Sequence, residues 1–195
     1  MPPLLFATHN QHKVDEVRAI LGDEIPVISL NDIEFNEELP ETHDTLKENA
    51  FEKAEFVHKK TGRDCFAEDT GLEIEVLGGE PGVRTARYAG PGKNSIDNIQ
   101  LVLQKLADNS NRKATFRTVI ACISKDNTIF FEGKITGSIS PKMSGIKGFG
   151  YDPVFIPEGY NKTFAELDAS IKNAISHRAK AFEDFKAYLQ KFNSK

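Results

Sequence analysis

The feature that most constrains this chain is the interleaving of strand-like and helix-like segments along its length. A short apolar run, LLFAT at 4–8, leads into a helical pattern over about 10–21, whose apolar face includes Val14, Val17 and Leu21. When a strand is followed by a short loop and an amphipathic helix, the apolar face of the helix is buried by packing against the sheet. The opening of the chain therefore predicts layered sheet and helix.

Three further helices are predicted downstream. Thr45 and Glu48 form a capping box ahead of an apolar stripe in TLKENAFEKAEFVHKK. Ser95 is expected to cap a helix over about 95–107, and the last helix is expected over about 174–192. Helices thus recur between strand-like segments along the chain.

Two long alternating segments predict an antiparallel pair. ATFRTVIACIS at 114–124 and TIFFEGKITGSIS at 128–140 flank a turn at Lys125–Asn127. An antiparallel pair within a chain of interleaved helices and strands implies a mixed sheet with helices packed on its faces. The predicted fold class is α/β, and it is not doubly wound.

Composition narrows the class of protein. The chain has 195 residues, 39% of them hydrophobic, and a formal net charge of -4, which favours one globular domain over 1–195. The mild acidity argues against a nucleic-acid partner. No signal-peptide pattern and no apolar run of about 18 residues is found, so we expect no membrane partner and a cytoplasmic location. Cys65 and Cys122 are expected to be reduced core residues.

Known phosphate-binding and nucleophile motifs do not account for the sequence. AGPGKNS resembles a P-loop, but the glycine required five residues before Gly92 is Arg87. GIKGFG has the glycines of a dinucleotide fingerprint in the wrong order, and there is no GxSxG elbow. Three separate polar clusters remain.

The first cluster is THNQHK at 8–13, where a buried strand meets a helix N-terminus. Backbone N–H groups, the positive end of the helix dipole, Asn10 and Lys13 would together hold an anion. The alternative is an ordinary N-cap followed by a surface lysine.

The second cluster is acidic and includes FAEDTG at 66–71. Glu41 lies in a predicted loop, and Glu68 and Asp69 are expected at a strand end. Hard cations such as Mg²⁺ prefer carboxylate oxygens, so an open acidic site suits them. The alternative is a solvated turn.

The third cluster lies in KNAISHR, where Lys172, His177 and Arg178 bracket a predicted helix start near the loop GFGYDP. Its side chains offer N–H donors for a polar ligand. The alternative is surface charge at a helix end.

Five stretches in order resemble the inosine triphosphate pyrophosphatase family almost from end to end. They are ATHNQHKVDEV, ETHDTLKENAFEKA, FAEDTGLEIEVLGGEPGVRTARYAG, GFGYDPVFIPEGYNKTFAEL and KNAISHRAKA. Three positions depart from the family's usual pattern: EDTG stands where many bacterial members have DDSG, His43 and Asp44 replace a usual glycine, and Ala179 replaces the glycine common after SHR.

The resemblance implies an elongated mixed sheet with flanking helices and two lobes around a central substrate cleft. It also implies a homodimer and Mg²⁺-dependent hydrolysis of ITP, dITP and XTP to the monophosphate and pyrophosphate, which removes non-standard purines from the nucleotide pool. Two other functions stay open. They are a Maf-like nucleotide pyrophosphatase and a module that binds modified purine nucleotides without hydrolysing them.

Residue roles follow from the resemblance position by position. It implies that Asp69 is the general base and lies beside the metal, with Glu41 and Glu68 as metal-associated acids. The implied substrate contacts are Thr8, His9, Asn10, Gln11, His12, Lys13, Lys53, Thr70, Phe149, Gly150, Tyr151, Asp152, Lys172, His177 and Arg178. Attack on the α-phosphorus needs a deprotonated water, a cation and a held leaving group, which Asp69, Mg²⁺ and Lys13 would supply.

Overall fold

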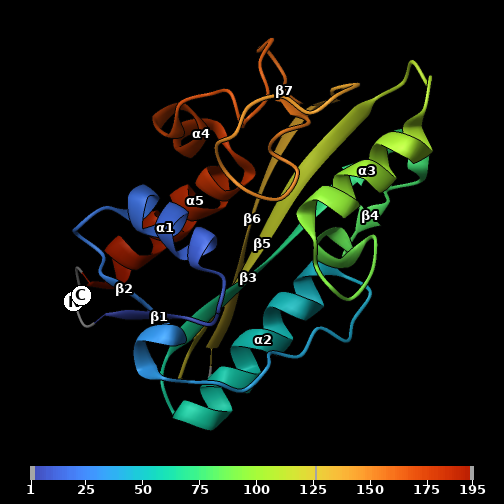
Figure 1. Cartoon of the computed structure of the whole chain (residues 1–195). Coiled ribbons are helices and arrows are strands. Elements are labelled where there is room, and N and C mark those ends of the chain that lie inside the picture. The colour runs from blue at the N-terminus through green and yellow to red at the C-terminus, as the bar shows by residue number, and fades with distance from the viewer. Residues whose placement is uncertain (1–2, 126, 194–195) are drawn as a thin grey trace. The chain divides into compact units, whose positions relative to one another are not determined.

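The structure is a computed structural model that describes residues 3–125 and 127–193 (Figure 1). The described strands are β1 (Leu4–Phe6), β2 (Val27–Ser29), β3 (Cys65–Ile74), β4 (Pro81–Gly82), β5 (Lys113–Ser124), β6 (Asn127–Ile139) and β7 (Phe155–Pro157). Their order in the sheet is β2-β1-β3-β5-β6-β7, with β4 paired to β3. Strand β1 is parallel to β2 and β3, whereas β4 and β7 are antiparallel to their neighbours. The prediction of an α/β fold with a mixed sheet is confirmed.

The described helices are α1 (Gln11–Leu21), α2 (Leu46–Thr61), α3 (Ser95–Leu106), α4 (Ala169–Ile175) and α5 (His177–Asn193), with 3-10 turns η1 (Asn31–Ile33), η2 (Glu75–Leu77) and η3 (Thr85–Arg87). Thr45 caps α2 by accepting from Glu48 N, and its hydroxyl donates to the Glu48 carboxylate at 2.7 Å. Thr45 is therefore the N-cap as predicted, and the Glu48 carboxylate reaches its hydroxyl group. Within the described residues, no helix is long and apolar enough to cross a membrane.

The described residues fall into two compact units. The first unit lies within Met1–Asp69, Thr118–Gly133 and Arg178–Lys195, and the second within Thr70–Arg117 and Lys134–His177. Strands β3, β5 and β6 contribute residues to both. The predicted functional residues are therefore divided between the units, and each set is described within its own unit.

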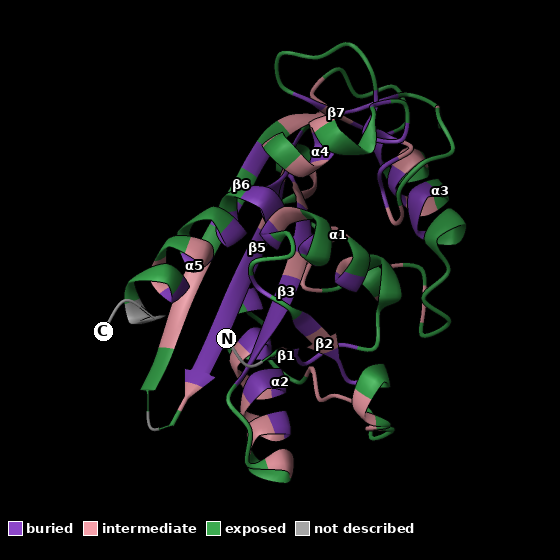
Figure 2. Cartoon of the chain, turned by 90° about the vertical axis from the view of Figure 1, so that its left-hand side faces the viewer, coloured by how far each residue is buried: buried purple, intermediate pink, exposed green. Residues whose placement is uncertain are grey.

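The core of the first unit has two clusters on opposite faces of the strands. One contains apolar residues of α1 and α5 together with Phe6 and Phe66, whose rings stack at 4.4 Å. The other contains apolar residues of α2 together with Ala67, Leu5 of β1, and Ala7, which directly follows β1. Buried residues run along β3 and β5 (Figure 2). The middle of β3 is thus covered on both faces.

The core of the second unit is a single cluster. It contains Ile99, Val102 and Leu106 of α3 and apolar residues of β3, β5 and β6. The rings of Phe116 and Phe155 lie 4.7 Å apart inside it. Both cysteines, by contrast, lie in the first unit and are buried and free, as the sequence predicted.

Three local predictions need correction, and a fourth contains a residue outside the described part of the chain. Asn94, and not Ser95, caps α3, because its side chain accepts from Ile96 N and Asp97 N. The predicted last helix is two helices separated at Ser176, whose ψ of 161° is extended. β3 continues through the acidic pair, which does not lie at a strand end. The Lys125–Asn127 turn contains residue 126, which lies outside the described residues.

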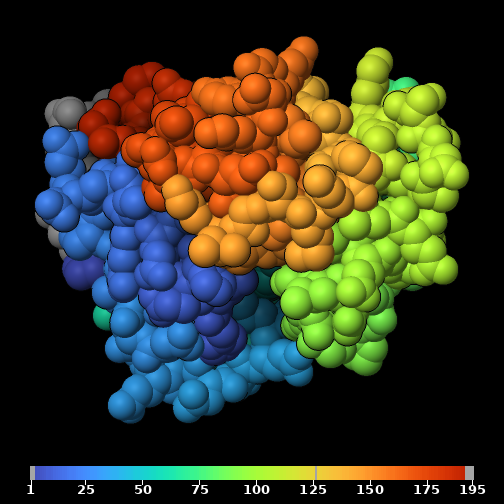
Figure 3. Space-filling view, turned by 45° about the horizontal axis from the view of Figure 1, so that its top comes forward, coloured from blue at the N-terminus to red at the C-terminus, as the bar shows by residue number. Residues whose placement is uncertain are grey.

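A surface loop at 141–150 leads into the predicted base-contact segment (Figure 3, light orange). At Gly145, φ is 82°, and an added Cβ would lie 2.3 Å from the carbonyl carbon of Ala165. Because backbone on both sides of this contact is fixed, only glycine fits. Gly159 has a similar φ of 84° but no atom within 4 Å of an added Cβ.

We expect Gly145→Ala to lower the free energy of unfolding by about 1–3 kcal/mol more than Gly159→Ala does. Both substitutions place an L residue at positive φ, but only the first adds a backbone collision. Denaturant unfolding of the two variants measures the difference. Equal losses would show that Gly145 is required for its φ alone.

Candidate active site

The candidate site centres on the middle of β3, where two adjacent acids lie inside the first unit. Glu68 and Asp69 are only 2% and 7% exposed. Successive side chains of a strand point to opposite faces of its sheet, so the two carboxylates enter different surroundings. Glu68 contacts residues of α1 and α5, whereas Asp69 contacts a residue of α2.

Glu68 forms a buried ion cluster. The Arg178 guanidinium donates Nε to Oε2 at 2.9 Å and Nη2 to Oε1 at 2.7 Å, which is a bidentate pair. Lys13 Nζ lies 3.1 Å from the same Oε1, and Glu16 accepts from Arg178 Nη1 at 2.6 Å. The cluster thus contains two carboxylates and two cationic side chains, whose formal charges cancel.

This cluster controls the protonation of Glu68. Burial alone would raise the pKa of Glu68, but Arg178 and Lys13 outweigh that effect and hold the pKa well below its usual range. Glu68 is therefore a carboxylate at neutral pH. Its neutralisation by Arg178 explains why β3 can continue through an acidic pair instead of ending there.

Asp69 belongs to a second cluster, centred on Lys53 of α2. Lys53 Nζ donates to Asp69 Oδ1 at 2.6 Å and to Glu41 Oε1 at 3.1 Å. Lys53 is 4% exposed, and the two carboxylates raise its pKa although burial alone would lower it. The ammonium group thus stays charged and fixes the position of Asp69.

Asp69 differs from Glu68 in its acidity. Burial raises the pKa of Asp69, and the nearby Lys53 and Lys13 only partly offset that rise. A raised pKa makes a carboxylate a better proton acceptor near neutral pH. Asp69 Oδ2 makes no hydrogen bond within the described part of the chain. Asp69 thus presents a second carboxylate oxygen that can take a proton.

The loop that carries Glu41 is fastened to α2. Glu52 accepts from Thr42 N at 3.0 Å and from Thr42 Oγ1 at 2.7 Å. Asn49, which is 1% exposed, accepts from His43 N at 2.9 Å and donates to His43 O at 3.0 Å. Four hydrogen bonds therefore hold the loop next to Glu41.

The three predicted metal-associated acids do not form one group. Glu41 and Asp69 share Lys53, whereas Glu68 points to the other face of β3 and pairs with Arg178. Among the described residues, no three His, Cys, Asp or Glu side chains lie together as a metal site. The pleat of the strand is the physical reason, because adjacent side chains cannot share a face.

The segment Thr8–Lys13 joins β1 to α1 as predicted. Asn10 caps α1 by accepting from Lys13 N at 3.3 Å, and Thr8 Oγ1 accepts from Asn10 N at 3.2 Å. Gln11 donates to Asp15 at 2.8 Å, and His12 is exposed. The helix N-terminus thus faces a short, ordered loop, and Lys13 extends from it to Glu68.

His9 in the same segment contacts two oxygen atoms of the chain. Its ring nitrogens lie 3.2 Å from Asn31 Oδ1 and 3.0 Å from Glu37 O. The ring of Phe35 lies alongside at a centroid distance of 6.5 Å. The His9 side chain therefore contacts the segment 31–37.

The predicted base-contact residues of the second unit gather around a buried ion pair between Asp152 and Lys172. Phe149 N donates to Asp152 Oδ2 at 2.8 Å. Lys172 Nζ lies 5.0 Å from the centroid of the Phe149 ring and 5.6 Å from that of Phe164. Phe149, Asp152 and Lys172, which were predicted to contact the base, thus lie together in this unit.

The other predicted residues of this unit are Thr70, Gly150, Tyr151 and His177. His177, 3% exposed, stacks on Phe116 with centroids 4.6 Å apart. Tyr151 donates its hydroxyl to Thr85 O at 3.0 Å, so it is held inside the unit. Thr70 and Gly150 are half-buried.

Sequence reasoning missed several residues of these clusters. Glu16 was missed, although it lies three residues after Lys13 and therefore on the same face of α1. Asn49 and Glu52 were also missed, and the helical spacing from Lys53 gave no sign that they would hold the preceding loop. Phe116 lies 61 residues before His177, so no local pattern connects the two.

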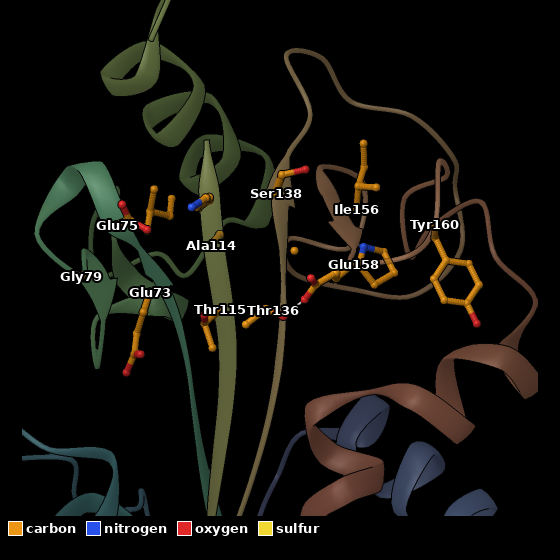
Figure 4. Close-up of a pocket in the computed structure, with 14 residues that line it drawn as sticks. Glu73, Glu75, Gly79, Ala114, Thr115, Thr136, Ser138, Ile156, Glu158 and Tyr160 are labelled. Carbon is orange, nitrogen blue, oxygen red and sulfur yellow. Dashed lines mark hydrogen bonds between the residues drawn. The ribbon is translucent and has the colours of Figure 1, made fainter. Parts of the chain in front are cut away.

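A cavity of about 690 Å³ lies within the second unit (Figure 4). Its lining comes from β3, β5, β6, β7 and the loops beside them, and includes Glu73, Thr115, Thr136 and Glu158. None of the residues predicted to contact substrate or metal lines it. The cavity is therefore separate from the predicted site residues of this unit.

The chain matches the model of the Ham1 family over residues 4–188. It is 50% identical over 190 residues to the dITP/XTP pyrophosphatase of Porphyromonas gingivalis. The aligned region covers 97% of this chain and 98% of that protein. It is 48% identical over 180 residues to the dITP/XTP pyrophosphatase of Flavobacterium johnsoniae. That aligned region covers 92% of this chain and 94% of that protein.

Solved structures agree with these matches. A HAM1 protein from Coxiella burnetii superimposes with a TM-score of 0.88 at 38% identity, covering 98% of this chain and 100% of that one. The Ham1 protein of Staphylococcus aureus gives a TM-score of 0.87 at 36% identity, covering 97% and 98%. The likeness thus extends over nearly the whole chain.

We expect Arg178→Lys to lower the free energy of unfolding by about 2–4 kcal/mol, because lysine cannot make the bidentate pair and leaves Glu68 buried with fewer donors. Arg18→Lys is the matched control: Arg18 and Asp32 pair at 2.8 Å with both side chains 42% exposed. Its loss should be below about 1 kcal/mol. Denaturant unfolding measures both, and similar losses would contradict the importance of the buried pair.

The depressed pKa of Glu68 predicts how stability depends on pH. The stabilising effect is complete above the ordinary Glu pKa of 4.5 and is lost as the pH falls further, because the unfolded chain then binds a proton that the folded chain does not. Relative to Glu68→Gln, the wild-type chain should lose about 1.4 kcal/mol per pH unit in that range. Unfolding measured from neutral to acidic pH checks this, and a constant difference would refute it.

Proposed function

This chain belongs to the Ham1 family, and on that basis we propose that it hydrolyses dITP, XTP and related non-standard purine nucleoside triphosphates to the monophosphate and pyrophosphate. Full-length relatives that are 48–50% identical are named dITP/XTP pyrophosphatases. They confirm the family resemblance inferred from the five motifs, and they favour this family over Maf-like pyrophosphatases.

The observation that carries the proposed chemistry is the buried Asp69–Lys53 pair. In the reaction, a water oxygen bonds to the α-phosphorus while the bond from that phosphorus to the bridging oxygen breaks. Asp69 accepts the proton that the water loses. Lys53 holds Asp69 at one oxygen, which leaves the other for the water.

Phosphate binding is assigned to the start of α1. The helix N-terminus offers backbone N–H groups and the positive end of its dipole to an anion. Lys13 adds a positive charge beside them, although part of that charge is offset by Glu68. These groups would hold the leaving pyrophosphate.

Carboxylate oxygens are the ligands that Mg²⁺ prefers, and Glu41 and Asp69 present them around one ammonium group. We propose that these two residues hold the ion, and that Glu68 acts through Arg178 and Lys13 instead. When bound, Mg²⁺ would offset the charge of the triphosphate and lower the pKa of water.

Base recognition is assigned to Phe149, Lys172 and His177 of the second unit, whereas Arg178, which was also predicted to contact the base, is paired with Glu68 and Glu16 in the first unit. Inosine and xanthosine carry an oxygen at C6, where adenosine carries an amino group. The N–H donors of Lys172 and His177 would bond to this oxygen and would be left unpaired opposite the amino group, at a cost of about 1–3 kcal/mol for each buried donor. A homodimer and a cytoplasmic location, which the resemblance and the sequence implied, stay predictions.

The test is pyrophosphate release from a panel of triphosphates, with and without Mg²⁺. We expect dITP, ITP and XTP to be hydrolysed far faster than ATP, and turnover to require the metal. Equal rates for ITP and ATP, or no release from any triphosphate, would overturn the proposed function.

Asp69→Asn should lower kcat by on the order of 10² or more while substrate still binds, because the proton acceptor is lost and the shape is kept. Asp108→Asn, at an exposed aspartate, should leave kcat unchanged. Turnover and binding of ITP by both variants make the comparison. Near-normal turnover in a folded Asp69→Asn protein would favour a binding module over an enzyme in which Asp69 is the base.

A further inference from the structure

Both ring nitrogens of His9 face protein oxygens. Nδ1 lies 3.2 Å from Asn31 Oδ1, and Nε2 lies 3.0 Å from the backbone oxygen of Glu37. The Asn31 amide is oriented by a second contact, because its Nδ2 donates to His9 O at 3.3 Å. The oxygen of Asn31 is therefore the atom that faces the ring.

The two acceptor oxygens determine which protonation state of the His9 ring can make both bonds. A backbone carbonyl and an amide oxygen can only accept, so each ring nitrogen must donate an N–H to make its bond. A neutral imidazole has one N–H and makes one of the two bonds. The imidazolium has two and makes both, with the added strength of a charged donor.

The contact joins two segments that meet at the start of α1. Leu30 N donates to Thr8 O at 3.4 Å, so the backbone ahead of His9 is already bonded to the strand end before η1. The His9 ring extends this link to residue 37 and lies against Phe35. Asn10, the next residue, caps α1. The link therefore lies directly before the N-terminus of α1.

The charged side chains of the surrounding segments have their own partners. Asp32 pairs with Arg18 at 2.8 Å, and Glu37 pairs with Lys60 at 2.8 Å. On the side of α1, Lys13 pairs with Glu68 at 3.1 Å. The exposed side chains of His12 and Glu34 are the other titratable groups of the two segments nearest to His9 in sequence.

We propose that the His9 imidazolium is a positioning residue that fastens the phosphate-contact segment Thr8–Lys13 to the segment 31–37. The role rests on the proposed function, because it matters for catalysis only if this segment binds the triphosphate. Loss of the proton breaks one of the two bonds, loosens the segment and weakens triphosphate binding. The chemistry of Asp69 is unaffected.

The experiment compares His9→Gln with the wild-type protein at about pH 6 and about pH 8.5, on either side of the range in which histidines titrate. Glutamine is neutral and keeps one donor group. At the lower pH, KM for ITP should rise on the order of tenfold in His9→Gln, with kcat within about twofold. At the higher pH, the ratio of the two KM values should approach one.

Two further variants sharpen the result. His58→Gln is the control, since the half-buried His58 ring meets a single carbonyl, Arg63 O, at 2.7 Å. Its KM should match the wild-type value at both pH values. Asn31→Asp keeps an acceptor opposite Nδ1 and adds a negative charge that favours the imidazolium. Its KM should stay low to higher pH than in the wild-type protein.

A ratio of KM values that is the same at both pH values would overturn the proposal, as would a fall in kcat without a rise in KM. Hydrogen exchange of the amides of residues 8–13 gives a readout that needs no turnover. It should be faster in His9→Gln than in the wild-type protein at the lower pH only. If no triphosphate is hydrolysed, the proposed function fails, and this measurement alone decides whether His9 fastens the segment.

Discussion

The buried pair between Glu68 and Arg178 is the interaction on which the rest of the first unit depends. A carboxylate and a guanidinium that are 2% and 1% exposed are costly to remove from water, and only close geometry offsets that cost. The bidentate contact provides it, and Glu16 and Lys13 satisfy the remaining charge. Arg178 belongs to α5 and Lys13 to α1, and both pair with Glu68 of β3. The ion cluster around Glu68 therefore fixes both helices against β3.

The strand pleat gives the neighbouring carboxylate a different chemistry. Asp69 enters the other face of β3, where a single lysine of α2 is its partner and burial dominates. One acid is therefore held firmly ionised, while the next has its pKa raised towards the range useful for a base. Two adjacent acids thus take different roles because one strand separates their surroundings.

Both clusters depend on loops that are held by neighbouring helices. The loop with Glu41 is bonded to α2 through Asn49 and Glu52, and the loop with His9 is bonded to the segment 31–37. Short segments between strands and helices are the usual place for functional groups, and rigid supports make them precise enough to act. The second unit applies the same principle, with Phe149 N bonded to Asp152 and Asp152 paired with Lys172.

The sequence by itself determined the fold class, several of the elements and the family. Periodicity and capping residues gave the mixed α/β class and the starts of α1 and α2, because these signals are local. The five motifs gave the family, which the relatives confirm. Local signals were weaker at the C-terminus, where the break at Ser176 lies inside an otherwise helical pattern.

Only the tertiary structure decided which of these residues meet. Glu68 and Arg178 are 110 positions apart, and no local pattern pairs them. The sequence placed Glu68 and Asp69 at a strand end beside one metal, whereas the continuous strand sends them to opposite faces and to different bases. The reason is physical: side-chain identity is encoded locally, but burial and charge partners, which set pKa and role, arise only when distant segments pack together.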